Sequence, residues 1–262
     1  KQRYWYDRCI SIAGGKPVEV GDDKGTTEAQ FKAAIGPRTA GVWFFAPGGE
    51  PGTLPFEKVL SIAKAHKLPV VVDAAGQVYP PDNLSKYARM GADLVAYGAK
   101  YILAPHSTGL LVGSKEMVRK AALHSFVSYE ARRVRSLGRA MKIDRQEIIG
   151  AVAALKEWLT MNHEDRIAKL DARIDTISRA VSKVKGVKVT PQRDRVPSYG
   201  MRIDWDPAQV TKSAAQVVAE LKQGEPPIWV RLSDPGILVA VVCLNEGEDA
   251  IVGERLAKAL KG

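Results

Sequence analysis

The chain is poor in cysteine and has no long nonpolar run. Of its 262 residues two are cysteines, Cys9 and Cys243, and they lie too far apart in sequence to form the paired spacing of a metal site. No disulfide framework is expected, which suits a reducing, cytoplasmic setting. No nonpolar run approaches the roughly 18 to 20 residues of a membrane span, and no signal-peptide-like region opens the chain, so no membrane partner is expected.

Acidic residues are fewer than basic ones. The chain has 39 Lys and Arg against 29 Asp and Glu, which gives a formal net charge of +10. Such an excess would attract a polyanion. However, the basic residues are scattered, apart from the stretch EARRVRSLGRAMK at 130–142. This distribution favours a basic surface on a soluble enzyme over nucleic acid as a partner.

The first half of the chain alternates strand and helix patterns. Thr27 and Gln30 are placed as a capping box at the start of one predicted helix. The helices are predicted at GTTEAQFKAAIG, LPFEKVLSIAKAHK and NLSKYARMG, and the strands at KPVEVG, TAGVWFFAP, LPVVVDAAG, ADLVAYG and TGLLVG. The second of these strands is nonpolar enough to be buried on both faces. The alternation predicts a largely parallel sheet covered on both faces, within a large domain at 1–118.

After residue 118 the pattern changes. We expect a connecting helical segment at 119–160 and a small α+β domain at 161–262. One long helical region is predicted from about Asp144 to Lys185, and its stripe of nonpolar residues indicates packing rather than a ligand site. The stripe consists of Ile167, Leu170, Ile174, Ile177, Val181 and Val184. Strands are then predicted at VKVTP, YGMRIDWD, PPIWVRL and GILVAVV, with helices at KSAAQVVAELK and EDAIVGERLAKALKG.

Two ionisable residues follow neighbouring strands of the predicted parallel sheet. Asp73 ends the strand PVVVD and Lys100 follows the strand DLVAYG, 100 − 73 = 27 residues later. A single βαβ step would bring both to the same sheet edge, where ligands bind in such sheets. A lysine amine can form a Schiff base with an aldehyde cofactor, commonly pyridoxal phosphate, and a carboxylate opposite the pyridine nitrogen keeps the ring protonated. Taken singly, Asp73 is ordinarily a turn cap and Lys100 a solvated loop residue.

The motifs around these two residues resemble those of a known family. They are VDAA, PPDNL, GADLV, YGAK and APHSTGLLVG, followed by LGRAMK and GEPPIWVR. Together they resemble the selenocysteine synthase-like enzymes, L-seryl-tRNA(Sec) selenium transferase and its relatives, over nearly the whole chain. That family comprises pyridoxal-phosphate enzymes of the aspartate aminotransferase fold (fold type I). The resemblance implies an α/β large domain with a mostly parallel sheet and a small α+β C-terminal domain.

The resemblance also implies roles for single residues. Lys100 matches the Schiff-base lysine and Asp73 the partner of the pyridine nitrogen. Gln77 could reach the cofactor ring or be an ordinary loop residue. Arg231 is a candidate for the substrate carboxylate, because a guanidinium grips a carboxylate bidentately; a structural ion pair is the alternative. No metal site is expected.

Two further positions each have a functional and a structural interpretation. Arg139, with Lys142, matches the family's "GR-x-MK"; these cations could contact a phosphate or substrate anion, or pair with acidic residues. His106 could be an acid/base group or a tolerated polar side chain.

The sequence departs from the family pattern beside Lys100. The family's SGGK is YGAK here, so Tyr97 replaces a small hydroxyl residue. GPQ is APH, so Ala104 replaces a glycine and His106 a glutamine. The alanine could shift the loop that carries Lys100. No small-residue phosphate loop precedes Asp73, so we expect that the natural protein begins earlier, by roughly 100 residues of the family's chain.

These features predict a pyridoxal-phosphate-dependent lyase or transferase acting on an amino acid or an amino-sugar acid. Lys100 would serve as the base for Cα–H abstraction, followed by β-elimination or replacement. A small-molecule amino substrate and a homodimer or higher homo-oligomer are the expected partners. One alternative is a catalytically impaired homologue that keeps the fold as a scaffold. A tRNA-binding module, suggested by the family name and the net charge, ranks lowest.

Overall fold

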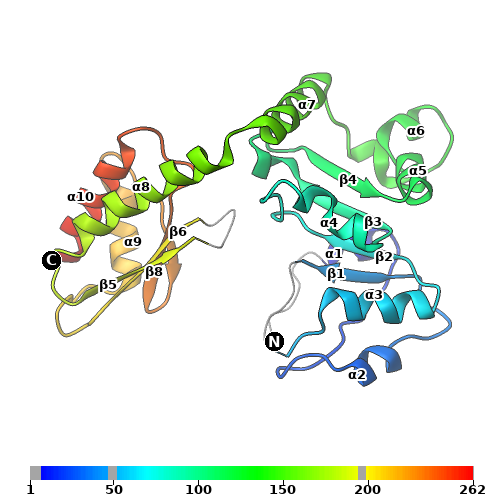
Figure 1. The fold of residues 1–262 in the computed structure, drawn as a ribbon, viewed down its shortest axis with the longest axis horizontal. Coiled ribbons are helices and arrows are strands. Elements are labelled where there is room, and N and C mark those ends of the chain that lie inside the picture. The colour runs from blue at the N-terminus through cyan, green and yellow to red at the C-terminus, as the bar shows by residue number, and fades with distance from the viewer. Residues whose placement is uncertain (1–6, 47–51, 194–198, 262) are drawn as a thin grey trace. The chain divides into compact units, whose positions relative to one another are not determined.

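The computed structural model describes residues 7–46, 52–193 and 199–261. The chain splits into two compact units, Lys1–Thr160 and Met161–Gly262, each with its own sheet (Figure 1). The finer division at residue 118 stays a prediction. Among the helices of the described ranges, none is both long and nonpolar enough to cross a bilayer.

The sheet of the first unit is mostly parallel, as predicted. Its strand order is β1-β2-β3-β4. The first three strands are parallel neighbours, and β4 runs antiparallel to β3. The strands are β1 (Val42–Phe45), β2 (Val70–Asp73), β3 (Leu94–Gly98) and β4 (Gly109–Gly113). Helix α3 (Phe56–Ala65) connects β1 to β2, and α4 (Asn83–Met90) connects β2 to β3.

Helices α3 and α4 cover one face of this sheet. The ring of Phe56 in α3 lies 5.0 Å from that of Phe44 in β1 and 5.2 Å from that of Tyr87 in α4. On the other face of β1, Trp43 and Phe45 are 39% and 56% exposed. The prediction that β1 is buried on both faces is therefore wrong, because its side chains alternate between a covered and a partly open face.

The remaining elements of the first unit are short, apart from α7. They are α1 (Arg8–Ile12), α2 (Glu28–Ala33), η1 (Ala99–Ile102), α5 (Lys115–Leu123), α6 (Phe126–Glu130), η2 (Leu137–Ala140) and α7 (Arg145–Thr160). The capping box of Thr27 and Gln30 at α2 is confirmed. The strand predicted at KPVEVG is wrong: the described residues 16–21 form no strand, and a turn closed between Asp22 and Gly25 follows them.

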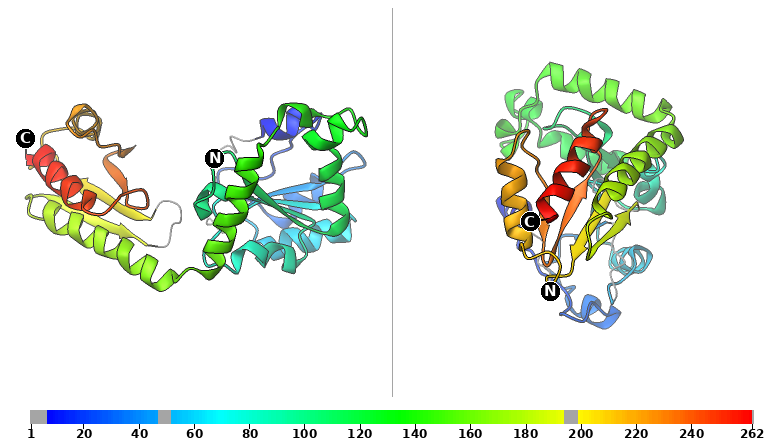
Figure 2. Two further views of the ribbon diagram at one scale, coloured as in Figure 1. Left: turned by 90° about the horizontal axis from the view of Figure 1, so that it is seen from above. Right: turned by 90° about the vertical axis from the view of Figure 1, so that its left-hand side faces the viewer.

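The second unit is an antiparallel sheet covered by helices. Its strand order is β5-β6-β8-β7. Its elements are α8 (His163–Val181), β5 (Val187–Gln192), β6 (Gly200–Trp205), α9 (Ala214–Gln223), β7 (Arg231–Ser233), β8 (Gly236–Ala240) and α10 (Glu248–Lys261). The three helices pack against one face of the sheet (Figure 2). The predicted stripe of α8 lies in this core, where Ile174 and Ile177 are fully buried.

The single helical region predicted at 144–185 is two helices. Helix α7 ends at Thr160 and α8 begins at His163. The break comes from Asn162, whose side chain accepts a hydrogen bond of 3.1 Å from the amide of Asp165 and so caps α8. The asparagine cap separates the helices, because a capping residue has nonhelical backbone angles.

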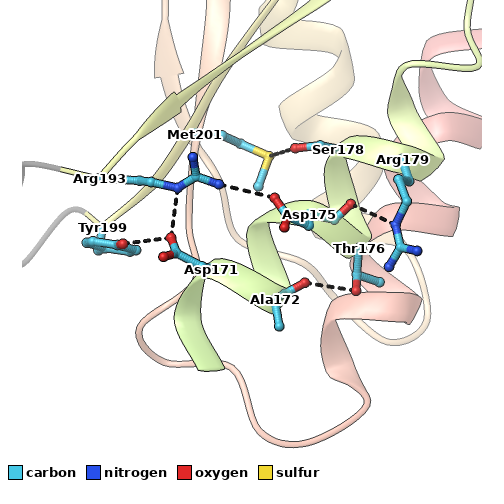
Figure 3. Close-up of polar contacts among 9 residues, drawn as sticks. All are labelled: Asp171, Ala172, Asp175, Thr176, Ser178, Arg179, Arg193, Tyr199 and Met201. Carbon is cyan, nitrogen blue, oxygen red and sulfur yellow. Dashed lines mark hydrogen bonds and ion pairs between the residues drawn. The ribbon is translucent and has the colours of Figure 1, made fainter. Parts of the chain in front are cut away.

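Polar contacts join α8 to the β5–β6 hairpin (Figure 3). The guanidinium of Arg193 lies 2.7 Å from Asp171 and 3.1 Å from Asp175, both on α8. The hydroxyl of Tyr199, directly before β6, donates a hydrogen bond of 2.7 Å to Asp171. Both ends of the hairpin connection therefore contact the same helix.

Candidate active site

Asp73 and Lys100 lie at the same edge of the first sheet. Asp73 is the last residue of β2, and Lys100 is in η1, directly after β3. The strands are parallel neighbours, with Asp73 opposite Ala96. The Asp73 carboxylate is half-buried, whereas Lys100 is exposed. The spacing of 27 residues thus places both at one edge, and their chemical roles stay predictions.

The turn after Asp73 is bonded to the end of β3. The amide of Gly98 donates a hydrogen bond of 2.9 Å to the carbonyl of Ala75, and the amide of Ala74 donates one of 3.0 Å to Ala96. One carboxylate oxygen of Asp73 accepts a bond of 3.1 Å from the amide of Ala75, as in an Asx turn. The turn holds this carboxylate in one orientation at the sheet edge.

The loop that carries Lys100 closes on itself. The amide of Ala99 donates a hydrogen bond of 3.0 Å to the carbonyl of Thr108, and that of Ala104 one of 3.1 Å to Ala99. The ammonium of Lys100 lies 5.2 Å from the ring centroid of Tyr101, within cation–π range. Within the described ranges no carboxylate pairs with it. Its amine is thus accessible to a ligand.

Gln77 and His106 lie in the same two loops. Gln77 is half-buried, and its amide donates a hydrogen bond of 2.8 Å to the carbonyl of Ala74 in the Asp73 turn. His106 is exposed in the loop of Lys100. The structure therefore brings four of the predicted site residues to one sheet edge.

Tyr97 and Ala104 have structural explanations. Tyr97 lies on the covered face of β3, opposite in direction to Ala96 and Asp73, and its hydroxyl donates a hydrogen bond of 2.6 Å to the carbonyl of Asn83 in α4. Burial raises the pKa of Tyr97 to about 12, with a smaller contribution from Tyr87. The left-handed residue of the Lys100 loop is Leu103, with φ 68°, so Ala104 needs no positive φ. Neither substitution alters the backbone requirements of the site.

Arg139 pairs with an acidic residue in this structure. Its Nε lies 2.9 Å from the carboxylate of Glu130. Its guanidinium and the ammonium of Lys142 lie 5.4 Å and 5.2 Å from the ring centroid of Phe126. Two cations thus gather at one aromatic ring, an arrangement that could still meet an anion because the Arg139–Glu130 pair is exposed.

Arg231 belongs to the second unit, where it is exposed on β7 opposite Leu238. Across Leu238 lies Arg202, whose guanidinium is held by Asp204 at 2.7 Å and by the Ser233 hydroxyl at 2.6 Å. The guanidinium of Arg202 is therefore occupied by contacts within the sheet, whereas Arg231 is exposed to solvent. Of this pair of arginines, Arg231 is the one suited to bind a carboxylate.

Sequence reasoning missed the contacts of α7 with the two site loops. The available signal was Gly150, a glycine inside a helical pattern, which ordinarily has a packing reason. In the part of the chain that is described, no three His, Cys, Asp or Glu residues form a group that could hold a metal ion.

Three curated proteins are similar to this chain over most of its length. 5'-C-glycyluridine monooxygenase-decarboxylase from Streptomyces sp is 28% identical over 229 residues, covering 86% of this chain and 54% of the relative. D-glucosaminate-6-phosphate ammonia lyase from Salmonella typhimurium is 28% identical over 257 residues, covering 95% and 64%. L-seryl-tRNA(Sec) selenium transferase from Alkaliphilus metalliredigens is 21% identical over 285 residues, covering 95% and 58%. The chain thus spans between 54% and 64% of these relatives.

Solved structures show the same fold. The structure of D-glucosaminate-6-phosphate ammonia-lyase matches with a TM-score of 0.70 and 26% identity, covering 94% of this chain and 64% of that one. Serine palmitoyltransferase from S. paucimobilis matches with a TM-score of 0.53 at 14% identity, covering 87% and 56%. The predicted aspartate aminotransferase-like α/β architecture is confirmed. Since residues 16–198 match the aminotransferase class-V family, over more than half of the sequence, the chain belongs to that family.

Proposed function

We propose that this chain carries the catalytic lysine and the ring-binding aspartate of a pyridoxal-phosphate-dependent lyase or transferase. The substrate would be an amino acid or an amino-sugar acid. The observation that carries the proposal is the placement of Lys100 and Asp73 at one sheet edge, on loops joined by the Gly98–Ala75 hydrogen bond of 2.9 Å. Ligands of open parallel sheets bind at such an edge.

The residues present fit pyridoxal phosphate. The exposed primary amine of Lys100 is the group that reacts with an aldehyde, and the carboxylate of Asp73 suits a protonated ring nitrogen. Lys100 would hold the cofactor's aldehyde carbon, Asp73 its pyridine nitrogen, and the Gln77 amide could contact the ring from the same turn. When bound, the cofactor supplies an electron sink for the carbanion at the substrate's Cα.

Each of the proposed site residues then has a defined task. The Nζ of Lys100 would take the proton from the substrate's Cα and could pass it to the leaving group. The Asp73 carboxylate keeps a proton on the ring nitrogen by accepting its hydrogen bond. Arg231, a residue of the second unit, stays our candidate for the substrate carboxylate, which its guanidinium would bind through two parallel hydrogen bonds. His106 is placed in the Lys100 loop, where it could relay a proton.

Within this proposal, elimination of ammonia from a phosphorylated amino-sugar acid is favoured over selenium transfer. The ammonia lyase is 28% identical to this chain over the matched 257 residues, whereas the selenium transferase from Alkaliphilus metalliredigens is 21% identical over 285 residues. Arg139 and Lys142, gathered at the Phe126 ring, are the cations available to a substrate phosphate. The selenocysteine synthase-like assignment is the alternative within the family.

A catalytically impaired scaffold is the second candidate, because the YGAK and APH segments depart from the family pattern. The positions of Tyr97, on the covered face, and of Leu103, which takes the left-handed conformation, argue against an impaired site. Both departures leave the loop of Lys100 closed by its own hydrogen bonds. The structure of the loop therefore favours the enzyme.

A covalent trapping experiment tests the proposal. The protein with its natural ends is incubated with pyridoxal phosphate, reduced with borohydride and digested, and the modified lysine is mapped by mass spectrometry. We expect one pyridoxyl group on Lys100, absent from Lys100→Gln and unchanged in the control Lys86→Gln, since Lys86 is an exposed residue of α4 outside the two site loops. A Lys100 that stays unmodified while other lysines react would overturn the proposal.

We also propose that the protein is a homodimer or higher homo-oligomer in the cytoplasm. In the single chain, α7 exposes large nonpolar side chains, which monomeric proteins rarely gather on one surface. They are Ile148, Ile149, Val152 and Leu159. The two free, exposed cysteines suit a reducing compartment. Light scattering on the protein as it elutes from a size-exclusion column measures the oligomeric state. A monomer at micromolar concentration would contradict the proposed homo-oligomer.

A further inference from the structure

We infer that helix α7 is a brace that sets the position of the Lys100 loop relative to the Asp73 turn. Glu147 and Trp158 are the positioning residues, one near each end of the helix, and Gly150 lets the helix approach. The inference rests on the proposed function, because it concerns the geometry of the same site. Both loops and the helix belong to the first unit.

Trp158 binds the Asp73 side of the site. Its side chain is 2% exposed, and its indole Nε1 donates a hydrogen bond of 3.1 Å to the carbonyl of Val78. Val78 is fully buried and directly follows the turn that the Gln77–Ala74 hydrogen bond closes after Asp73. A buried tryptophan has one N–H donor, and without it the Val78 carbonyl would lose this partner in a site closed to water.

Glu147 binds the Lys100 side of the site. One oxygen of its carboxylate accepts a hydrogen bond from the hydroxyl of Ser107, and the other accepts one of 3.1 Å from the amide of Asp144. These hydrogen bonds, that from Ser107 foremost, lower the pKa of Glu147 below its usual value. Glu147 is in the first turn of α7, where the helix dipole favours a negative charge. The carboxylate therefore stays ionised and holds the loop at neutral pH.

Gly150 brings the helix backbone against the same loop. A Cβ at this position would lie 2.8 Å from the ring of Pro105, closer than real Cβ contacts. Any larger residue would push Pro105, and with it Ser107 and Thr108, away from the helix. Thr108 accepts the hydrogen bond from Ala99, directly before Lys100. A shift of the Pro105 segment is thereby passed to Lys100.

The three contacts lie along one side of a rigid element. Positions 147, 150, 154 and 158 follow at helical spacing, and the last two, Ala154 and Trp158, are buried. Glu147 and Trp158 are eleven residues apart, which corresponds to about 16 Å along the helix axis. A helix of this length couples the two loops, which the Gly98–Ala75 and Ala74–Ala96 hydrogen bonds also join at the strand ends. A displacement of about 1 Å in such a site costs roughly 100-fold in rate.

The first test uses hydrogen exchange on the protein without added cofactor. Amides that report on the Lys100 loop are those of Ala99 and Ala104, and the amide of Gln77 reports on the Asp73 turn. Glu147→Ala and Gly150→Ala are expected to speed the exchange of the amides at 99–108 by about fivefold or more. Trp158→Phe is expected to speed the exchange of the amides at 74–78 by a similar factor. Glu147→Gln, which keeps an acceptor for Ser107, should restore protection, and the exposed-face control Lys156→Ala should change neither.

The second test measures the site itself. With pyridoxal phosphate bound, Gly150→Ala and Trp158→Phe should shift the pH midpoint of the lysine–cofactor absorbance and lower kcat by about tenfold or more, while KM stays within about twofold. Exchange that is unchanged in all three variants overturns the inference, and so does exchange that rises equally throughout the first unit. If pyridoxal phosphate does not react with Lys100 of the unaltered protein, the proposed function is wrong. The inference about α7 is tested separately, by the hydrogen-exchange pattern alone.

Discussion

The amide of Gly98 donates a hydrogen bond of 2.9 Å to the carbonyl oxygen of Ala75. Gly98 stands two residues before Lys100, and Ala75 two residues after Asp73, so the bond joins the two chain segments next to the proposed catalytic pair. A Cβ on residue 98 would lie 3.1 Å from the ring of Tyr101, over which the Lys100 ammonium is placed. Because residue 98 is a glycine, the Gly98–Ala75 hydrogen bond can form while the Tyr101 ring lies next to it, beneath the Lys100 ammonium.

Removing the charge of Asp73 should lower turnover without removing the cofactor. In Asp73→Asn the side-chain oxygen can still accept the hydrogen bond from Ala75, so the turn is kept. An amide cannot hold the proton on the ring nitrogen, and kcat should fall by about 100-fold or more. Steady-state kinetics with borohydride mapping checks both parts. Asp82→Asn, at the exposed start of α4, is the control, and an Asp73→Asn enzyme with full kcat would contradict the assigned role.

Replacing Arg231 should weaken substrate binding more than chemistry. The exposed guanidinium has the fork geometry that a carboxylate accepts, and lysine lacks it. Arg231→Lys should raise KM by about tenfold with little change in kcat, and Arg231→Gln should raise KM further. Arg179→Lys, on the helical side of the second unit, serves as control. An unchanged KM in both variants would show that another group binds the carboxylate.

Tyr97→Phe should change stability at alkaline pH rather than activity. Burial is the main cause that raises the pKa of Tyr97 in the folded protein to about 12, above the ordinary tyrosine value of 10.0. Its contribution is therefore fully present below pH 10 and is lost as the pH rises from 10 through 12, because only the unfolded state ionises in that window. The variant should unfold with a weaker pH dependence there, and lose about 1 kcal/mol at neutral pH with its hydrogen bond to Asn83.

Urea unfolding at a series of pH values measures this effect. Tyr129→Phe, an exposed tyrosine of the same unit, is the matched control and should follow the unaltered protein. Identical pH profiles for Tyr97→Phe and the unaltered protein would contradict the explanation.

Nonpolar packing should outweigh the ion pairs of Figure 3 in the second unit. Ile177 is fully buried, and Ile177→Ala should lower the free energy of unfolding by about 2–5 kcal/mol. The Arg193 side chain is 47% exposed, so Arg193→Ala should cost less than about 1 kcal/mol despite its two carboxylate partners. Denaturant unfolding measures the loss of unfolding free energy in each of the two variants. Equal costs would mean that the ion pairs, rather than the core, hold the β5–β6 hairpin on α8.

Local patterns in the sequence were sufficient where a single element decides the outcome. The capping box of Thr27 and Gln30 and the buried stripe of α8 were predicted, because capping and helical periodicity depend on residues close in sequence. Asp73 and Lys100 could be placed at one edge because a βαβ connection permits little else. The break at Asn162 was missed, since a cap inside a long periodic region leaves the periodicity almost unchanged.

The sequence by itself determined the class of fold, the pair of residues at the sheet edge and the family resemblance that connects them to pyridoxal phosphate. Only the tertiary structure decided which face of β1 is covered, that Tyr97 points away from Asp73, and that Glu147, Gly150 and Trp158 contact the two site loops. The physical reason is that periodicity specifies which side chains are buried, whereas the neighbour that buries them comes from segments distant in sequence.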